Sequence, residues 1–362
     1  MDPAALASRL EAIDGRLPGS DAERRAAALC ARELRGAGRS VRTQTLWFRP
    51  HRAVPRAVIA AVGVAGSVLA AGHPVLGTAL TGGALLAALL DAAGVRVLAP
   101  LLPRRATQNV LAPPPGPRGD RAVLLIVASV DAPRRALARR LERPAGLRPA
   151  PGALGWLLLA LVAVLLCAAL RIGGTGGTAL GVIQLVPSIV LIALAGLFID
   201  AAAGPPLVPS AAGGAAVALA IAQALDARPP AALAPEVLLA GAGEAGAAGM
   251  AALVAHRRGR LAPEDIIVLE LRPGDGPVRC VVREGELGGS RLHPRLAELA
   301  LALPGVEPAQ RRGRGAARVA RGAGWPAIAL EGPPRALAPA ALRLVAAIDR
   351  EVAQRRAAAP RG

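Results

Sequence analysis

The sequence predicts an α/β fold, a mixed sheet flanked by helices that is interrupted by two transmembrane helical hairpins. One observation behind this prediction is the apolar run 123–127, which is typical of a buried strand in a parallel sheet and is followed by a polar turn, 129–131. The other is a set of four long apolar stretches that come in two pairs. With 53% hydrophobic residues and a mean hydropathy of +0.45, the chain is more apolar than an ordinary soluble domain.

Outside the apolar stretches, strand patterns and helix patterns alternate along the chain. Ser20 or Asp21 is placed to cap an Ala-rich helix, and the residues after that helix have the alternation of a strand. The expected strands are 41–47, 108–111, 123–127, 237–240, 266–271, 278–282 and 327–330, and the expected helices are 2–14, 21–35, 133–143, 213–225, 244–256, 291–303 and 338–354. We therefore expect one α/β domain assembled from three separate pieces of the chain.

The apolar stretches predict two membrane hairpins, because about 20 apolar residues are needed for each crossing. The expected spans are 57–71, 75–93, 153–170 and 178–199, and the first of them is short. The expected organisation is an N-terminal domain piece (1–52), a first hairpin (53–103), the central strands (104–150), a second hairpin (151–203) and a C-terminal domain piece (204–362). An even number of crossings keeps all three domain pieces on one side of a cell membrane, and the Arg residues near the spans predict the cytoplasmic side.

The formal net charge of +18 predicts anionic partners. Arg134, Arg135, Arg139 and Arg140 lie just before the second hairpin, so we expect them to contact anionic lipid headgroups. The chain has no nucleic-acid motif, and we interpret the Gly-Arg-rich segment 311–321 as a solvated loop rather than an RNA contact. The three cysteines have no pairing pattern, so disulfides are not expected.

Three short motifs carry a family resemblance. Residues 17–20 read Leu-Pro-Gly-Ser before a helix, residues 108–112 read Gln-Asn-Val-Leu-Ala, and residues 324–328 read Gly-Trp-Pro-Ala-Ile. In this order and spacing the sequence resembles the co-catalytic zinc aminopeptidase family, peptidase family M-28, over about 260 residues outside the apolar inserts. The resemblance implies a zinc-peptidase-like α/β domain into which the hairpins are inserted.

The chemistry of that family needs two zinc ions held by His, Asp and Glu, with a bridging water and a Glu that acts as general base. The resemblance places the first ligand His, part of a His-x-Asp motif, at Ser129, and serine is a poor zinc ligand. Asp131 retains the Asp of that motif, which in the family orients the His. The bridging Asp of the family falls on Ser210. Two of the family's ligands are therefore expected to be lost.

The second half of the motif set is also incomplete. The paired Glu-Glu of the family falls on Gly243 and Glu244, so the general base is replaced and one ligand carboxylate is kept. The next ligand Asp falls on Glu270, and the last ligand His is missing because no His follows His293. Asp131, Glu244 and Glu270 remain as candidate site residues. They are either a weak site for a hard cation such as Mg²⁺ or simply solvated carboxylates at strand ends.

Three other features have two interpretations each. Gly241, Gly243 and Gly246 match the Gly-x-Gly-x-x-Gly pattern of dinucleotide-binding loops, but the family resemblance explains this segment better. Asp91 lies inside a span, where acids are often functional, and a contact with Arg96 or a headgroup is the simpler expectation. Gln184 and Pro187 mark either a helix interface or a passive kink.

The sequence thus predicts a membrane-embedded, peptidase-like protein that has lost catalysis and acts as a binding or scaffolding module, with no cofactor. A protein or peptide ligand is expected, although its identity does not follow from the residues. The alternative is an active membrane-bound zinc aminopeptidase with an atypical ligand set, which requires a replacement imidazole from His256 or His293. In that alternative the cofactor is zinc.

Overall fold

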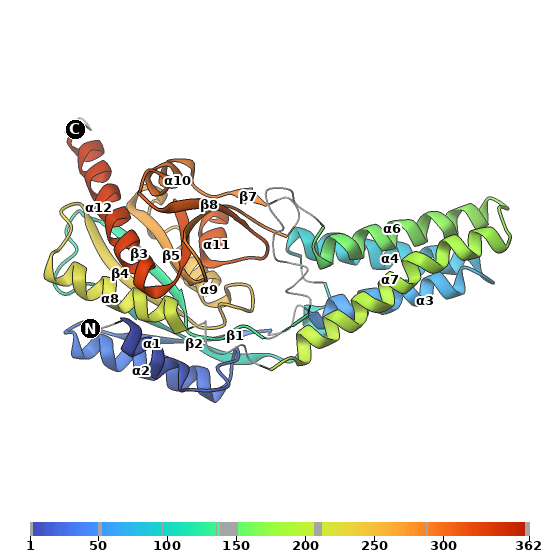
Figure 1. Ribbon diagram of the computed structural model, residues 1–362, viewed down its shortest axis with the longest axis horizontal. Coiled ribbons are helices and arrows are strands. Elements are labelled where there is room, and N and C mark those ends of the chain that lie inside the picture. Colours follow the sequence, from blue (N-terminus) through green and yellow to red (C-terminus); the bar gives the residue numbers. More distant parts are fainter. Residues whose placement is uncertain are drawn as a thin grey trace.

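The computed structural model describes residues 3–49, 53–95, 97–134, 136–137, 151–205, 212–286 and 289–358. An α/β domain forms one end of the molecule, and a bundle of long helices projects from it (Figure 1). Strands before the first hairpin, between the two hairpins and after the second hairpin build one continuous sheet.

Over the described ranges the sheet has nine strands in the order β1-β2-β4-β3-β5-β9-β6-β7, with β8 paired to β6. Its strand β3 (Ala122–Ser129) is central and almost wholly buried, because its apolar side chains pack on both faces. The other strands are β1 (Arg42–Phe48), β2 (Arg105–Ala112), β4 (Leu233–Ala240), β5 (Ile266–Pro273), β6 (Val278–Glu284), β7 (Ser290–Arg291), β8 (Val306–Arg311) and β9 (Ala327–Gly332).

Strand direction places the carboxyl ends of the central strands next to the helical bundle. Strand β2 follows the first hairpin and runs away from the bundle, and β4 is antiparallel to it. Strands β3 and β5 are parallel to β4, and β9 is parallel to β5, so all four run toward the bundle. In open α/β sheets this carboxyl edge is where ligands bind.

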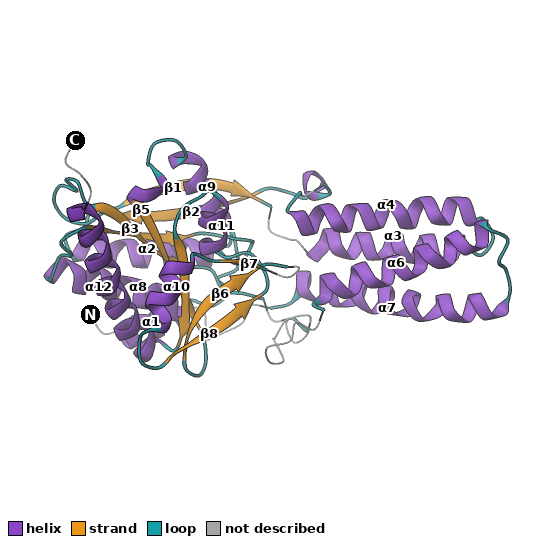
Figure 2. Ribbon diagram, turned by 90° about the horizontal axis from the view of Figure 1, so that it is seen from above, coloured by secondary structure: helices purple, strands orange, loops and turns teal. Residues whose placement is uncertain are grey.

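Helices cover both faces of the sheet. On one face α1 (Pro3–Glu11), α2 (Asp21–Gly36), α8 (Gly213–Ala227) and α12 (Pro334–Ala358) pack together. On the other face α9 (Ala248–Arg257) and α11 (Ala316–Gly322) pack side by side (Figure 2). Helix α10 (Pro294–Leu301) covers β6, β8 and β9. Ser20 is the N-cap of helix α2, and its side chain accepts the Glu23 N–H at 3.1 Å, so the predicted cap is confirmed.

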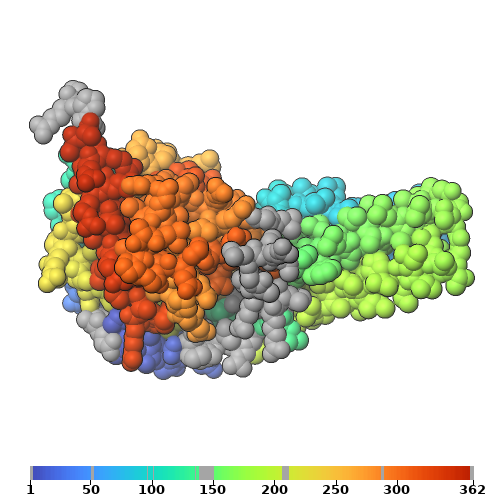
Figure 3. Space-filling view, turned by 45° about the horizontal axis from the view of Figure 1, so that its top comes forward, coloured from blue at the N-terminus to red at the C-terminus, as the bar shows by residue number. Residues whose placement is uncertain are grey.

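The bundle consists of the two predicted hairpins. Helices α3 (Ala53–Leu69) and α4 (Pro74–Ala93) form the first, and α6 (Ala153–Ile172) and α7 (Thr178–Ala203) form the second. Their outward side chains are largely apolar, with Leu86, Leu166, Ile183 and Val186 more than half exposed, and the bundle extends well beyond the domain (Figure 3). Helices α4, α6 and α7 are long and apolar enough to cross a membrane, whereas α3 has only 17 residues.

Polar side chains inside the bundle find partners on neighbouring helices. Gln184 on α7 donates to the backbone oxygen and the hydroxyl of Ser67 on α3 at 2.7 and 2.8 Å, and Arg171 donates to Gln184 at 3.1 Å. Gln184 therefore lies at a helix interface. Asp91 accepts from Arg56 at 2.8 Å, so the salt bridge joins α3 to α4. The expected contact of Asp91 with Arg96 stays a prediction, because Arg96 lies outside the described residues.

Two local predictions are wrong where the structure describes them. A helix does not begin at Pro133, since residues 133–134 and 136–137 are not helical and Arg134 is in a β-bridge. The rest of the expected helix lies outside the described residues. The segment 311–321 is not one solvated loop. Strand β8 ends at Arg311, and α11 begins at Ala316. The Arg312 guanidinium packs against the start of α6, since a Cβ placed on Gly152 would lie 3.1 Å from it.

Candidate functional site

The loop between β4 and α9, residues 241–247, lies at the carboxyl edge of the sheet next to the end of β3. Its backbone is strained, because Ala242 and Ala247 both have positive φ, at 51° and 56°. This conformation turns successive backbone N–H groups toward side chains from three other elements. Loops of this kind in other proteins bind external anions, so the partners of these N–H groups decide what this loop can bind.

Asp131 holds the middle of the loop. Its Oδ1 accepts from the Gly243 N–H at 2.8 Å and its Oδ2 accepts from the Glu244 N–H at 2.9 Å. The residue is 1% exposed. Burial raises the pKa of the Asp131 carboxyl well above its ordinary value, and the negative charges of Glu23 and Glu244 raise it further, while the two N–H donors oppose the shift. Asp131 therefore fixes the loop instead of orienting a metal-binding His.

Glu23 and Asn109 hold the start of the loop. Glu23, from α2, accepts the Ala242 N–H at 2.7 Å and the Gly19 N–H at 2.6 Å, and its burial raises the pKa of its carboxyl. Asn109 on β2 accepts the Gly241 N–H at 3.1 Å. With Asp131, these side chains occupy four successive N–H groups of the loop. The dinucleotide interpretation of Gly241, Gly243 and Gly246 is therefore not supported, because the donors that would meet a pyrophosphate already bind the protein's own side chains.

Ser129 and Gly243 lie directly against one another. A Cβ placed on Gly243 would overlap with the Ser129 hydroxyl, and it would lie 2.7 Å from the Ser129 Cβ and 3.2 Å from Asp131 Oδ1. The position that the resemblance assigns to the first ligand His and the position that it assigns to the general base are thus in contact. The space that a glutamate at 243 would need is filled by residue 129. As the chain stands, neither side chain can supply an imidazole or a basic carboxylate.

Glu270, the other carried-over ligand position, lies in a separate cluster. Its Oε2 accepts from Arg272 Nη2 at 2.7 Å and from the Ala317 N–H at 2.7 Å. The same Arg272 nitrogen donates to Glu284 Oε1 at 2.6 Å. Burial is the largest single influence and would raise the pKa of Glu270, but the charge and hydrogen bond of Arg272 and the N–H groups of Ala316 and Ala317 together outweigh it, so the net direction is down. The Glu270 carboxylate is therefore ionised and bound to a cation from the protein itself.

Glu244 is an exposed residue beside Asp131, and Ser210 lies outside the described residues. Within the part of the chain that the structure describes, no group of three or more His, Cys, Asp or Glu side chains is arranged to hold a metal ion. Asp131, Glu244 and Glu270 thus do not converge on one site. The donor set does not fit the two-zinc centre that the resemblance implies, because the carboxylates at 131 and 270 are bound by N–H groups or a guanidinium and no imidazole of a described residue joins them.

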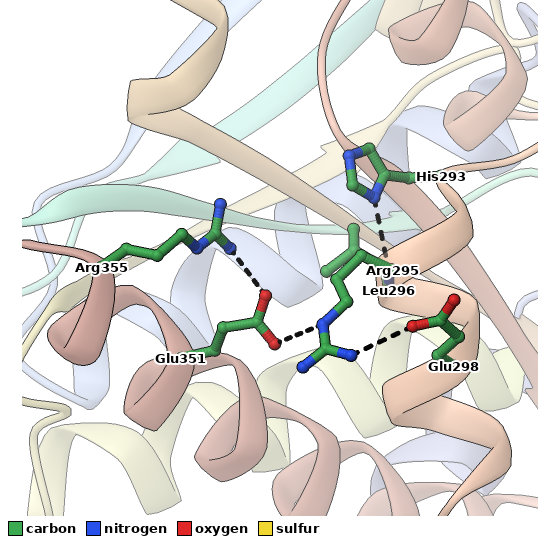
Figure 4. Close-up of polar contacts among 6 residues, drawn as sticks. All are labelled: His293, Arg295, Leu296, Glu298, Glu351 and Arg355. Atoms are coloured by element: carbon green, nitrogen blue, oxygen red, sulfur yellow. Dashed lines mark hydrogen bonds and ion pairs between the residues drawn. The ribbon is translucent and has the colours of Figure 1, made fainter.

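Neither histidine named for the alternative ligand set is near this region. His293 begins α10, where its Nδ1 accepts the Leu296 N–H at 3.4 Å. Its neighbours belong to a surface cluster in which Glu351 forms ion pairs with Arg295 and Arg355 (Figure 4). Burial and the charges of Arg321 and Arg355 lower the pKa of His293, which favours the neutral ring that a cap requires. His256 is exposed in the last turn of α9, 3.4 Å from an Arg260 nitrogen.

Solved structures with the same architecture come from bacterial exopeptidases. The chain is similar to an aminopeptidase from Aneurinibacillus sp. strain AM-1, with 13% identity over 98% of this chain and 93% of that one and a TM-score of 0.50. It is also similar to a leucine aminopeptidase precursor from Bacteroides thetaiotaomicron, with 10% identity, 95% of both chains covered and a TM-score of 0.51. The chain has the aminopeptidase fold. A zinc aminopeptidase from Bacillus subtilis matches at 12% identity and a TM-score of 0.48 over 98% of this chain and 94% of that one.

No protein family and no curated protein sequence matches this chain. The predicted zinc-peptidase-like α/β fold is nevertheless confirmed, because the structural similarity extends over nearly the whole of both chains. At these identities the similarity concerns the fold alone. What the site does must follow from its own side chains.

Sequence reasoning missed the residues that complete the two clusters. Glu23 stands in a Ser-x-x-Glu capping pattern, which indicates a helix start but not a hydrogen bond to the β4–α9 loop. Arg272 and Glu284 belong to no recognisable motif. Glu270 and Arg272 are two residues apart on β5, however, so their side chains lie on the same face of the sheet. That spacing was the available signal for an internal ion pair.

Proposed function

We propose that this chain is a membrane-embedded protein with an aminopeptidase fold that does not hydrolyse peptides and acts as a binding or scaffolding module. The observation that carries the proposal is the contact between Ser129 and Gly243. Peptide hydrolysis by this fold needs a metal-bound water and a base that takes its proton. The resemblance assigns the first zinc ligand to position 129 and that base to position 243. Here the Ser129 side chain occupies the space that a side chain at position 243 would need.

The state of the remaining carboxylates supports the same proposal. A catalytic carboxylate must be able to exchange a proton or bind a metal during turnover. Asp131 uses both oxygens to hold the β4–α9 loop, and Glu270 is bound to Arg272. The active-enzyme alternative needs a replacement imidazole. His256 lies beside Arg260, and His293 accepts the Leu296 N–H at the start of α10. We find no observation that favours it.

The membrane placement rests on the bundle. Three helices have the length and composition to cross a bilayer. Arg134, at the base of the bundle, donates to the Gly204 backbone oxygen at 2.7 Å just after α7 ends. We propose that Arg134 and the neighbouring Arg135, Arg139 and Arg140, which lie outside the described residues, contact anionic headgroups of a cell membrane from the cytoplasmic side.

An activity assay tests the loss of catalysis. The detergent-purified protein is incubated with a panel of aminoacyl-coumarin substrates and with added zinc, cobalt or manganese. We expect no turnover above that of the Glu244→Ala variant. Turnover that appears with metal and disappears in Glu244→Ala would show that the chain is an enzyme and would overturn the proposal.

Cysteine labelling tests the membrane placement. The three native cysteines are buried, so single cysteines introduced at Gly176, between α6 and α7, and at Asp275, between β5 and β6, can be compared in whole cells. We expect a membrane-impermeant maleimide to label position 176 in intact cells and position 275 only after lysis. Labelling of both positions in intact cells would contradict the cytoplasmic placement, and labelling of neither would contradict the exposed bundle tip.

A further inference from the structure

Arg272 lies between two buried carboxylates at the carboxyl edge of the sheet. Its Nη2 donates to Glu270 at 2.7 Å and to Glu284 at 2.6 Å. The side chains of Glu270 and Glu284 are 7% and 1% exposed, whereas the Arg272 side chain is 19% exposed. One cationic group therefore joins β5 to β6 through two acids that have little access to water.

The segment before α11 completes the enclosure of this cluster. The Gly315 N–H donates to Glu284 Oε1 at 3.1 Å, and the Ala317 N–H donates to Glu270 Oε2 at 2.7 Å. Position 315 has no room for a side chain, since a Cβ there would overlap with Arg272 Nη2 and lie 2.7 Å from its Cζ and 2.9 Å from Glu270 Oε1. Glycine at 315 is thus what lets the backbone approach the guanidinium so closely.

When both acids of the cluster are ionised, a cation between them is stabilising. Two carboxylates bound to one centre repel each other, and a buried carboxylate without a counter-ion is strongly unfavourable. Glu284 Oε2 has no hydrogen-bond partner in the described part of the chain, so Glu284 depends on Arg272 and on one backbone N–H. Carboxylate oxygens that converge on a positive centre are also the donor type by which proteins hold divalent metals.

We propose that the guanidinium of Arg272 is a built-in cation that replaces a metal ion at Glu270, so that this half of the site is stable without metal. The inference deepens the proposed loss of catalysis and rests on it, because Glu270 is the position that the resemblance assigns to a zinc ligand. It also makes a separate claim. When the guanidinium is removed, Glu270 and Glu284 are left as a pair of carboxylates that a divalent cation can bridge.

The test is rescue of stability by metal, measured as the thermal midpoint of the full-length protein in detergent. We compare wild type, Arg272→Ala and Arg272→Lys, each with EDTA, zinc, magnesium or calcium. We expect the wild-type midpoint to be the same under all conditions. Arg272→Ala should unfold roughly 6–20 °C lower in EDTA, because it leaves two buried acids without a counter-ion. Zinc or another divalent ion should recover part of that loss, whereas Arg272→Lys should fall between the two and not respond to metal.

Two further variants secure the result. The triple variant Glu270→Gln, Arg272→Ala, Glu284→Gln removes the carboxylates, so metal should not raise its midpoint. If Arg272→Ala does not fold, Gly315→Ala displaces the guanidinium by the overlap described above and should show the same metal response in milder form. A midpoint of Arg272→Ala equal to that of wild type, or one that no metal raises, overturns the inference.

The proposed function fails in a different way. Zinc that raises the wild-type midpoint would indicate a metal site elsewhere and would contradict the loss of zinc chemistry. That result would leave the role of Arg272 to be decided by the Arg272→Ala comparison alone. The two claims are therefore tested by different proteins in the same experiment.

Discussion

At the scale of single residues, Ser129 and Gly243 are in direct contact, because the serine hydroxyl lies where a Cβ on Gly243 would be. Interiors are close-packed, so a larger side chain at position 243 would force its neighbours to shift. The contact keeps the loop after β4 close to the end of β3.

Adding one methyl group at this contact tests its tightness. We expect Gly243→Ala to lower the free energy of unfolding by about 1–3 kcal/mol, since overpacked sites must shift their backbone. In a Ser129→Gly background the same change should cost less, because the overlapping hydroxyl is gone. Urea unfolding of the four proteins measures both values. Gly36→Ala, where a Cβ meets nothing within 4 Å, serves as the control, and an equal cost in both backgrounds would contradict the contact.

Asp131 should make the stability of the domain depend on pH. Its pKa is raised in the folded state, so the folded state binds a proton more readily than the unfolded one. Stability from this group is therefore present at low pH and is lost as pH rises from about 4 toward the raised value. We expect the stability difference between wild type and Asp131→Asn to grow in favour of wild type between pH 8 and pH 5.

The matched control for that pH series is Asp275→Asn, because Asp275 is exposed in the turn after β5. Its stability difference from wild type should be flat over the same range. Unfolding midpoints in urea at each pH provide the measurement. A wild-type advantage over Asp131→Asn that shrinks on acidification would show that the folded protein lowers the pKa of Asp131 instead.

At the scale of helices and strands, hydrophobic patterning predicts most of the domain and the hairpins. Strands such as β3 and β5 are apolar runs of ordinary length, and α4 begins at Pro74 and ends before Gly94, which has a φ of 94°. Patterning fails where an element is short or polar. Strand β7 has two residues, β8 has no fully buried residue, and α11 lies in a Gly-Arg-rich segment. These elements form because neighbouring strands and helices hold them, which a local pattern does not show.

The site was predictable only in part for the same reason. In the structure Ser129, Asp131, Gly243 and Glu244 lie at one edge of the sheet. The roles of Asp131 and Glu270 depend on Glu23, Arg272 and Glu284, which come from distant elements. Which buried acid meets which N–H or guanidinium is set by tertiary packing. Carrying ligands over one position at a time therefore finds the place but not the bonding.

The first hairpin contains an ion pair that should couple its two helices. Arg56 lies 2.8 Å from Asp91 across the hairpin and 3.4 Å from Glu286 beside β7, and the Arg56 and Asp91 side chains are 10% exposed or less. Removing one partner of a buried pair typically costs about 3–5 kcal/mol. We expect Asp91→Leu and Arg56→Leu each to lower the thermal midpoint of the full-length protein strongly.

The double variant shows whether the pair itself is responsible. Arg56→Leu with Asp91→Leu should lose much less than the sum of the two single changes, because neither charge is then left buried alone. Arg9 and Glu33, an ion pair whose arginine is 55% exposed, provide the control, and its removal should have little effect. Strict additivity for the Arg56 and Asp91 variants would contradict a direct coupling.

At the scale of the whole molecule, the apolar bundle stands at the same edge of the sheet as the candidate site. The carboxyl ends of β3, β4, β5 and β9 all face the bundle, and the second hairpin starts a short distance after β3 in the chain. In a bilayer, a partner reaching this edge would do so next to the membrane surface. The proposed function, a binding module at the membrane surface, depends on this placement of the bundle beside the candidate site.

Metal content tests this account most directly. The detergent-purified full-length protein is dialysed against trace zinc and then analysed for bound metal, and the same sample is treated with EDTA before thermal unfolding. We expect near-zero zinc per chain and an unchanged midpoint, because the donor positions are replaced or bound within the protein. About two zinc ions per chain, the number in co-catalytic centres, together with a midpoint that falls in EDTA, would contradict the loss of the metal site.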